Sequence, residues 1–129
     1  MLQLEHIHHI AIICSDYTRS RHFYTEILGL KVMQEVYRAD RDSYKLDLAL
    51  NGQYVVELFS FPDPPKRLSG PEGRGLRHLA FAVKDVSASV RQLAQQGINC
   101  EPVRTDPHTQ KQFTFFQDPD QLPIELYEI

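Results

Sequence analysis

Apolar and polar residues alternate along the first half of the chain in a way that predicts one helix among several strands. Alternation with a period of two predicts a strand over 6–14, and apolar positions three to four residues apart predict a helix over 17–28. Three further strands are predicted over 31–38, 44–50 and 53–61. The first half therefore reads βαβββ.

Local signals set the ends of these elements. Asp16 can cap the helix N-terminus, because its carboxylate can accept the unpaired N–H groups of the first turn. Gly29 is placed to end the helix. Asn51 and Gly52 predict a tight hairpin between the last two strands, since both residues tolerate a positive φ.

The second half repeats the same plan. Asp85 is placed to cap its helix and Gly97 to end it. The predicted elements are a strand over 76–83, a helix over 86–96 and strands over 98–104, 111–117 and 122–128. Residues 62–75 hold four prolines and three glycines, which predicts a linker between the halves. We expect one α+β domain over 1–129, built from a module over about 6–61 and a module over about 76–128. A sheet with one helix leaves a face uncovered, so the two modules should pack together and form a concave sheet.

Two short motifs recur in the same order in the two halves. His9-Ile-Ala-Ile-Ile-Cys-Ser-Asp16 resembles His78-Leu-Ala-Phe-Ala-Val-Lys-Asp85, 69 residues further along. Val56-Glu57-Leu58-Phe59 resembles Ile124-Glu125-Leu126-Tyr127, 68 residues further along. Each half therefore carries one histidine and one glutamate at equivalent positions.

These four polar residues are the candidate metal ligands: His9, Glu57, His78 and Glu125. Imidazole nitrogens and carboxylate oxygens both suit first-row divalent ions. Any one of them could instead be a hydrogen-bonded residue at the rim of a sheet, but a glutamate inside an apolar strand costs free energy unless it has a partner. His8 competes with His9 as a ligand. The repeat favours His9, because only His9 keeps the spacing to an aspartate that His78 keeps; His6 and His8 are expected on the sheet surface.

Charge and composition exclude other classes. The net charge of -3 gives no basic face for nucleic acid. No run of about 18 apolar residues is present, so no membrane span is expected. The N-terminus lacks the basic and apolar regions of a signal peptide. Cys14 and Cys100 are expected to be free thiols of a cytoplasmic protein, with a disulfide between them as the alternative.

From His9-Ile-Ala-Ile to Asp118-Pro-Asp-Gln-Leu-Pro-Ile-Glu125-Leu, the sequence resembles the vicinal oxygen chelate superfamily, and within it the bacterial glyoxalase I-like metalloproteins. The resemblance implies paired βαβββ modules in a homodimer with metal sites at the subunit interface. It also implies the same four ligands, with nickel, zinc or cobalt as the metal and manganese or iron as alternatives. The implied activity is that of a lyase or isomerase like lactoylglutathione lyase, which moves a proton next to a carbonyl of a small molecule. Glu125 is then the general base and Glu57 a second acid or base.

Two positions depart from the glyoxalase I pattern. Ile13 stands where an arginine commonly contacts glutathione, and Phe61 where an asparagine does, which argues against glutathione as the substrate. Gln121 replaces the usual glycine of a turn, with some strain expected if its φ is positive. Side chains that could hold an anionic tail of the substrate are Arg38, Arg41, Arg77 and Lys111. Aromatic residues that could line the pocket are Tyr44, Tyr54 and Phe115.

The resemblance leaves two other functions open. The first is an iron-dependent ring-cleaving dioxygenase, which typically uses two histidines and one carboxylate; the fourth ligand, Glu57, argues against it. The second is a non-catalytic protein that sequesters a drug, a class that usually lacks the ligands.

Overall fold

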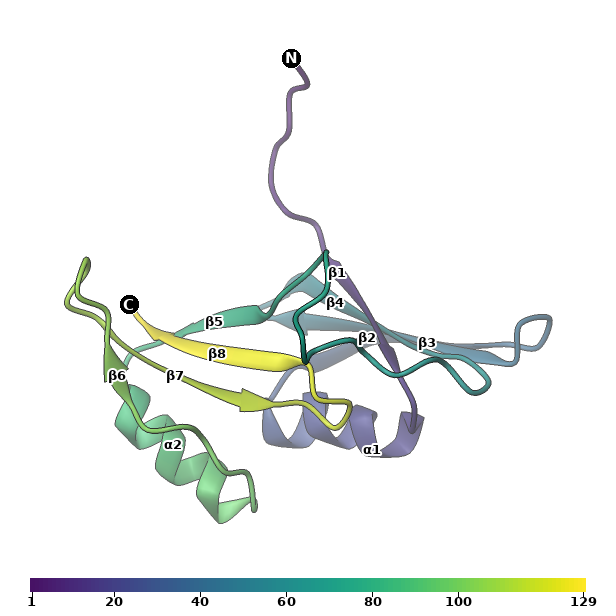
Figure 1. Cartoon of the computed structure of the whole chain (residues 1–129). Helices are drawn as coiled ribbons and strands as arrows, with labels where there is room; N and C mark the ends of the chain where they lie inside the picture. The colour runs from purple at the N-terminus through teal and green to yellow at the C-terminus, as the bar shows by residue number, and fades with distance from the viewer. The chain divides into compact units, whose positions relative to one another are not determined.

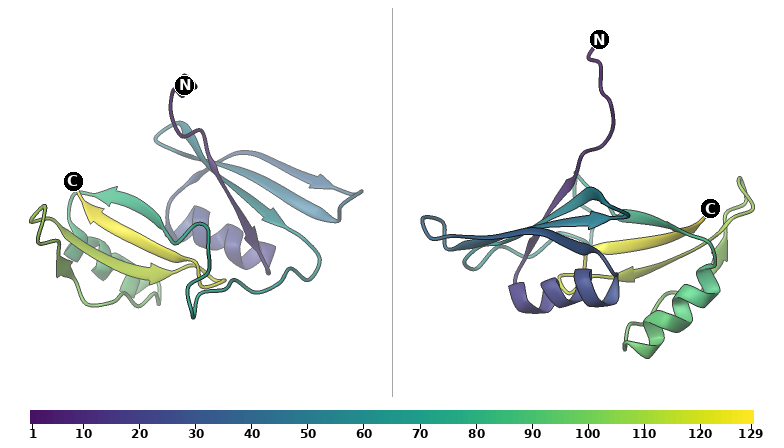
Figure 2. Two further views of the ribbon diagram at one scale, coloured as in Figure 1. Left: turned by 45° about the horizontal axis from the view of Figure 1, so that its top comes forward. Right: turned by 180° about the vertical axis from the view of Figure 1, so that it is seen from behind.

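Each βαβββ series folds into a four-stranded sheet with a helix against one face (Figure 1). The computed structural model describes all residues, 1–129, and separates them into two compact units, 1–65 and 66–129. The boundary falls inside the predicted linker. Two further views show the helix of each unit beside its own sheet (Figure 2).

The first unit contains one four-stranded mixed sheet in the order β1-β4-β3-β2, in which β1 and β4 are parallel and the other pairs antiparallel. Its elements are β1 (Ile10–Cys14), α1 (Tyr17–His22), the π-helical turn η1 (Phe23–Ile27), β2 (Lys31–Arg38), β3 (Ser43–Leu50) and β4 (Gln53–Ser60).

Alternation within the strands gives this sheet one apolar face. The buried side chains on that face include Ile12, Leu46, Leu48, Val56 and Leu58, all at most 7% exposed. Phe23 and Tyr24, from the helical segment, and Leu30 beyond it are also buried. Removing these apolar side chains from water is the main stabilising term of such a core.

The predicted helix over 17–28 forms, but its second part differs from a regular α-helix. Asp16 caps its start, with the carboxylate accepting a hydrogen bond from the Arg19 N–H at 3.1 Å. After His22 the chain widens into η1, where the Leu28 N–H donates to the Phe23 carbonyl. Gly29 follows with a φ of 81°, and this left-handed residue ends the helix as predicted.

A bulge interrupts the pairing of β4 with β3. Asp47 pairs with Glu57 and Leu48 with Val56, but Ala49 pairs with Tyr54, so Val55 is the extra residue. A bulge shifts the alternation of side chains by one position. Tyr54 therefore comes onto the face that carries Glu57, although the two are three positions apart in sequence, an odd number that regular alternation places on opposite faces. The Asn51-Gly52 turn that precedes it has positive φ at both residues, as predicted.

The second unit repeats this topology in the order β5-β8-β7-β6, with β5 and β8 parallel. Its elements are β5 (Leu79–Val83), α2 (Val86–Gln95), β6 (Arg104–Thr105), β7 (Gln112–Gln117) and β8 (Pro123–Glu128). Asp85 caps α2 by accepting from the Ala88 N–H at 2.9 Å. The buried side chains include Val86, Leu93, Thr114, Phe116, Ile124 and Leu126.

Three predicted strands are shorter than expected by more than one residue. The strand over 6–14 begins only at Ile10 and the strand over 76–83 only at Leu79, because the alternation continues where no neighbouring strand pairs with it. The strand over 98–104 was wrong for most of its length, since only Arg104 and Thr105 pair with β7. Pro102 lacks an N–H for a continuous ladder. The preceding Glu101 is held to β7 by two separate hydrogen bonds. The Glu101 N–H donates to the Phe115 carbonyl, and Thr114 Oγ1 donates to the Glu101 carbonyl.

The turn at Gln121, the two cysteines and the helices were also the subject of predictions from the sequence. Gln121 has a φ of 68° at the turn before β8, so the condition under which the sequence predicts some strain there is met. Neither Cys14 nor Cys100 is part of a disulfide bond. Neither helix is long and apolar enough to cross a membrane.

Candidate functional site

In the first unit, His9 and Glu57 lie close together on the sheet face opposite the core. Ala11 pairs with Glu57 across β1 and β4, and His9 precedes Ala11 by two residues, so all three share that face. His9 Nε2 lies 3.9 Å from Glu57 Oε1. The glutamate side chain is 15% exposed and the histidine side chain 36%. The carboxylate is thus mostly withdrawn from water beside an imidazole.

In the second unit, His78 and Glu125 form the equivalent pair. His78 Nε2 lies 3.0 Å from Glu125 Oε2, and the two side chains are 27% and 13% exposed. Ala80 pairs with Glu125 just as Ala11 pairs with Glu57. The motifs found in the sequence therefore correspond to the same register in both sheets.

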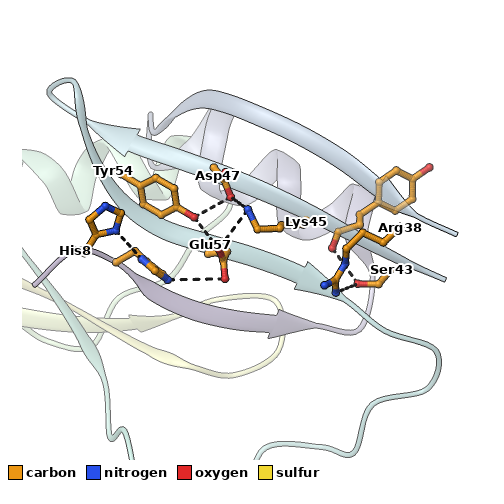
Figure 3. A network of polar contacts seen from close by, with 9 residues as sticks. His8, Arg38, Ser43, Lys45, Asp47, Tyr54 and Glu57 are labelled. Atoms are coloured by element: carbon orange, nitrogen blue, oxygen red, sulfur yellow. Dashed lines mark hydrogen bonds and ion pairs between the residues drawn. The ribbon is translucent and has the colours of Figure 1, made fainter. Parts of the chain in front are cut away.

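Glu57 belongs to a polar network that crosses β3 and β4 (Figure 3). The Tyr54 hydroxyl lies 2.9 Å from Glu57 Oε2 and 2.8 Å from Asp47 Oδ1 and donates to these carboxylates. Lys45 Nζ donates to Asp47 Oδ1 at 2.7 Å and lies 3.4 Å from Glu57 Oε2. Two donors are thus shared between two carboxylates.

The environment keeps both donors protonated. Burial raises the pKa of Tyr54, and its hydrogen bonds to Asp47 and Glu57 raise it further. The hydrogen bond to Asp47 raises the pKa of Lys45 against the opposing effect of burial. At neutral pH the network therefore consists of a phenol and an ammonium group that hold Glu57 in place.

Glu125 has no such network. Its neighbour across the ladder is Phe115, in the place that Asp47 takes opposite Glu57. Phe115 instead packs edge-on against the His78 ring, with the centroids 5.1 Å apart. Glu125 pairs with His78, and its charge also acts on the Arg77 guanidinium. The two halves therefore match in their histidine–glutamate pairs and differ in what surrounds them.

The other N-terminal histidines are placed differently from His9. His8 Nδ1 lies 2.8 Å from His9 Nδ1, and its ring packs against Tyr54 at 5.1 Å. His6 stacks on His8 with the centroids 6.1 Å apart. Both residues are exposed, and the ion pair with Glu57 is made by His9.

The four candidate cations for an anionic substrate separate into two kinds. Arg77 is engaged by Glu72 at 2.7 Å, and Lys111 Nζ donates to the Ile129 carbonyl at 2.8 Å. Arg38 and Arg41 instead lie over aromatic rings and make no ion pair. The two departures noted in the sequence lie near them: Phe61 is under both guanidinium groups, and Ile13 pairs with Phe59 on the same face as Glu57.

Among the predicted pocket aromatics, Tyr54 and Phe115 contact the histidine–glutamate pairs. Tyr44 does not, because it stacks on Tyr17 with the centroids 4.3 Å apart.

The donor chemistry of each pair fits a first-row divalent metal: one imidazole and one carboxylate, facing each other and partly shielded from water. No group of three or more histidine, cysteine, aspartate or glutamate side chains converges in the structure. Each half thus supplies two of the four predicted ligands.

Sequence reasoning missed Lys45 and Asp47. A signal was present, because they are the two charged residues of an otherwise mostly apolar strand and share a face. The contact of Tyr54 with Glu57 had no such signal. Strict alternation would put the two side chains on opposite faces of the sheet, and only the bulge at Val55 brings them onto one face.

The sequence profile of the glyoxalase/bleomycin resistance protein/dioxygenase superfamily matches residues 6–126, nearly the whole chain. The chain belongs to this superfamily. Two α+β modules with four-stranded mixed sheets are the fold expected of a glyoxalase superfamily member, so the predicted fold class is confirmed.

Relatives within the superfamily are close over their full length. The uncharacterized protein YwkD of Bacillus subtilis (strain 168) is 64% identical, with 97% of this chain and 98% of YwkD covered. The uncharacterized protein YaeR of Escherichia coli (strain K12) is 62% identical, with 99% of both chains covered. A crystal structure of a glyoxalase family protein from Enterococcus faecalis is 46% identical, with a TM-score of 0.89 and coverage of 96% of this chain and 98% of that one.

Proposed function

We propose that His9, Glu57, His78 and Glu125 bind one divalent metal ion, and that the protein is a glyoxalase I-like lyase or isomerase. Its reaction would be a proton transfer next to the carbonyl group of a small molecule. The proposal extends the superfamily assignment, which includes enzymes, to a particular chemistry.

The observation that carries the proposal is the repeated histidine–glutamate pair. In each unit the pair lies on the sheet face opposite the core, in the same register, with a glutamate side chain that is at most 15% exposed. A mostly buried carboxylate is costly unless it has a partner. One such pair is an ordinary polar contact, whereas two equivalent pairs are expected of a site that needs four ligands.

Ligand chemistry limits the metal. Two imidazoles and two carboxylates suit nickel, zinc or cobalt and also accept manganese or iron. When bound, such an ion supplies Lewis acidity that polarises a carbonyl oxygen and makes the neighbouring C–H bond more acidic. Because each half offers one pair, the four ligands come from both halves, taken from one chain or from two chains of a homodimer.

The surroundings of the two glutamates support different roles for them. Tyr54 and Lys45 hold Glu57, so this carboxylate keeps its position and serves mainly as a ligand and a second acid or base. Glu125 accepts no hydrogen bond from a tyrosine or a lysine: it pairs with His78, interacts with the Arg77 charge and faces Phe115. A carboxylate with few restraints can rotate toward a substrate, so Glu125 is the general base that accepts the proton from carbon and returns it to the neighbouring atom.

An assay of protein loaded with nickel, cobalt or zinc tests this function, with methylglyoxal and a series of small thiols as substrates. We expect metal-dependent turnover with at least one thiol. The Glu125→Gln variant should lose more than about 100-fold in kcat, because an amide cannot accept the proton. Glutathione is not expected to be the preferred thiol, since Ile13 and Phe61 occupy its usual contact positions.

Glu128→Gln is the matched control. Glu128 lies on the same strand as Glu125 and accepts a hydrogen bond from the Gln112 N–H instead of facing a histidine. Its substitution should leave kcat within about twofold of the unmodified protein, as for most changes remote from the reacting atoms. Inactivity with every metal and thiol would remove the glyoxalase form of the proposal.

A further inference from the structure

Two arginines lie over a pair of phenylalanine rings at one end of the first sheet. The Arg38 guanidinium carbon is 4.9 Å from the Phe59 ring centroid and 5.8 Å from that of Phe61. The Arg41 guanidinium carbon is 5.3 Å from the Phe61 centroid. Both guanidinium groups thus make a cation–π contact with the same ring, Phe61.

The small residue opposite Arg38 allows this arrangement. Arg38 ends β2 and pairs with Ser43, which is fully buried. The Arg38 side chain crosses β3 above this serine, donates from Nη2 to Ser43 Oγ at 3.0 Å and reaches β4 (Figure 3). A bulky side chain at residue 43 would fill the space through which Arg38 passes.

No carboxylate lies within ion-pair distance of either guanidinium group. Neither Arg38 nor Arg41 has an ion-pair partner, and Arg38 Nε is buried without a hydrogen-bond acceptor. By contrast, Arg21, Arg77 and Arg104 are engaged by glutamates within 3.1 Å. Arginines without acidic partners on a partly buried surface favour an anion, because their planar fork matches a carboxylate or a phosphate.

The arginine pair lies beside the proposed metal ligand Glu57. Phe59 follows Glu57 by two residues on the same strand and the same face, a step of about 7 Å. The same face carries Lys45 opposite Phe59, with the exposed Ile13 as the other neighbour of Phe59. A molecule of a few carbon atoms could therefore place one end near Glu57 and the other near Arg38.

We propose that Arg38 and Arg41 form a subsite for an anionic group of the substrate, so that the substrate class is a small carbonyl compound with a terminal carboxylate or phosphate. This inference rests on the proposed function for the location of the carbonyl end. The anion subsite itself can be tested without any activity.

Calorimetric titration of the full chain tests the subsite, with and without zinc. The probes are succinate for a carboxylate, methyl phosphate for a phosphate and succinamide as the neutral analogue. We expect one of the two anions to bind in the absence of zinc, with affinity falling as salt rises, and succinamide not to bind. Which anion binds more tightly identifies the group that the substrate carries.

Arg38→Met should weaken anion binding at least tenfold while the zinc affinity stays unchanged, because methionine retains an apolar stem over Phe59 and removes the charge. Arg104→Met is the matched control. Arg104 lies over Phe113 and Phe115 at 4.9 and 5.8 Å, the same distances as for Arg38, but its guanidinium is engaged by Glu101. This control should bind the anion as the unmodified protein does.

Arg41→Met provides a second variant at an exposed position, should Arg38→Met fail to fold as judged by circular dichroism. It too should weaken anion binding. Equal affinity of both variants and the control, or no binding of either anion, would overturn the subsite. Failure of the protein to bind zinc would count against the proposed function alone, because anion binding is measured without the metal.

Discussion

Single residues show how far the sequence can define the site. The pairs His9 with Glu57 and His78 with Glu125 could be predicted, because each is a polar residue in an apolar motif that occurs twice. The contact of Tyr54 with Glu57 could not, because it depends on the bulge at Val55. Sequence spacing predicts which side chains share a face only where a strand is regular, and a bulge has no recognisable pattern in the sequence.

The hydroxyl of Tyr54 gives a prediction at this scale. Tyr54→Phe removes one donor to Glu57 and keeps the ring that packs against His8 and His9. We expect metal affinity to fall by about tenfold, as is usual when a hydrogen bond to a ligand is lost. Competition with a chromophoric chelator measures the affinity.

Tyr37→Phe is the control for this change. The Tyr37 hydroxyl bonds to Asp42, on an exposed turn, so its loss should leave metal affinity unaltered. If Tyr54→Phe and Tyr37→Phe bind the metal equally well, the network does not position Glu57.

At the scale of elements, the sequence predicted the order of the helices and strands, and its main errors are the strand over 98–104 and the second part of the first helix. The strand expected over 98–104 shrinks to β6 because pairing depends on a neighbour and not on alternation alone. The change from α1 to η1 has no sequence signal that we recognise. The caps at Asp16 and Asp85 were predictable, because side-chain acceptors act on the adjacent turn.

The attachment of α1 to β2 gives a prediction of pH dependence. Glu35 on β2 accepts hydrogen bonds from Tyr17 and Arg21 of α1. Both bonds lower the pKa of the Glu35 carboxyl, and the bond from Tyr17 has the larger effect. A pKa lowered by folding stabilises the protein above the unfolded pKa of about 4.3 and ceases to do so as pH falls through the folded pKa. The contribution is therefore present at pH 7 and lost in acid.

Glu35→Gln should lower the free energy of unfolding at pH 7 by less than about 1 kcal/mol, since the ion pair is partly exposed. Urea unfolding at pH 7 and at pH 3 measures the difference, which should shrink at pH 3. Glu26→Gln, at an exposed helical residue, is the control and should show little difference at either pH. A Glu35→Gln deficit that grows in acid would contradict this account.

At the scale of the whole chain, the repeat connects sequence, fold and function. The motif offsets of 69 and 68 residues correspond to one register, Ala11 with Glu57 and Ala80 with Glu125. The repeat predicts what the halves share, namely topology and the histidine–glutamate pairs. It cannot predict where they diverge, as at Asp47 and Phe115, and the separate roles that we propose for the two glutamates rest on those differences.

The central claim is that four residues, two from each half, bind one metal ion, and titration of zinc or nickel into untagged protein tests it most directly. We predict one ion per chain. Each single alanine variant of a ligand should lose more than about 100-fold in metal affinity, which is more than the loss of a hydrogen bond to a ligand usually costs. The variants are His9→Ala, Glu57→Ala, His78→Ala and Glu125→Ala. His8→Ala removes a side chain that hydrogen-bonds to the His9 ring but is not itself a proposed ligand, so it should cost no more than about tenfold in affinity. No binding by the unmodified protein, or an equal loss in His8→Ala and His9→Ala, would contradict the account.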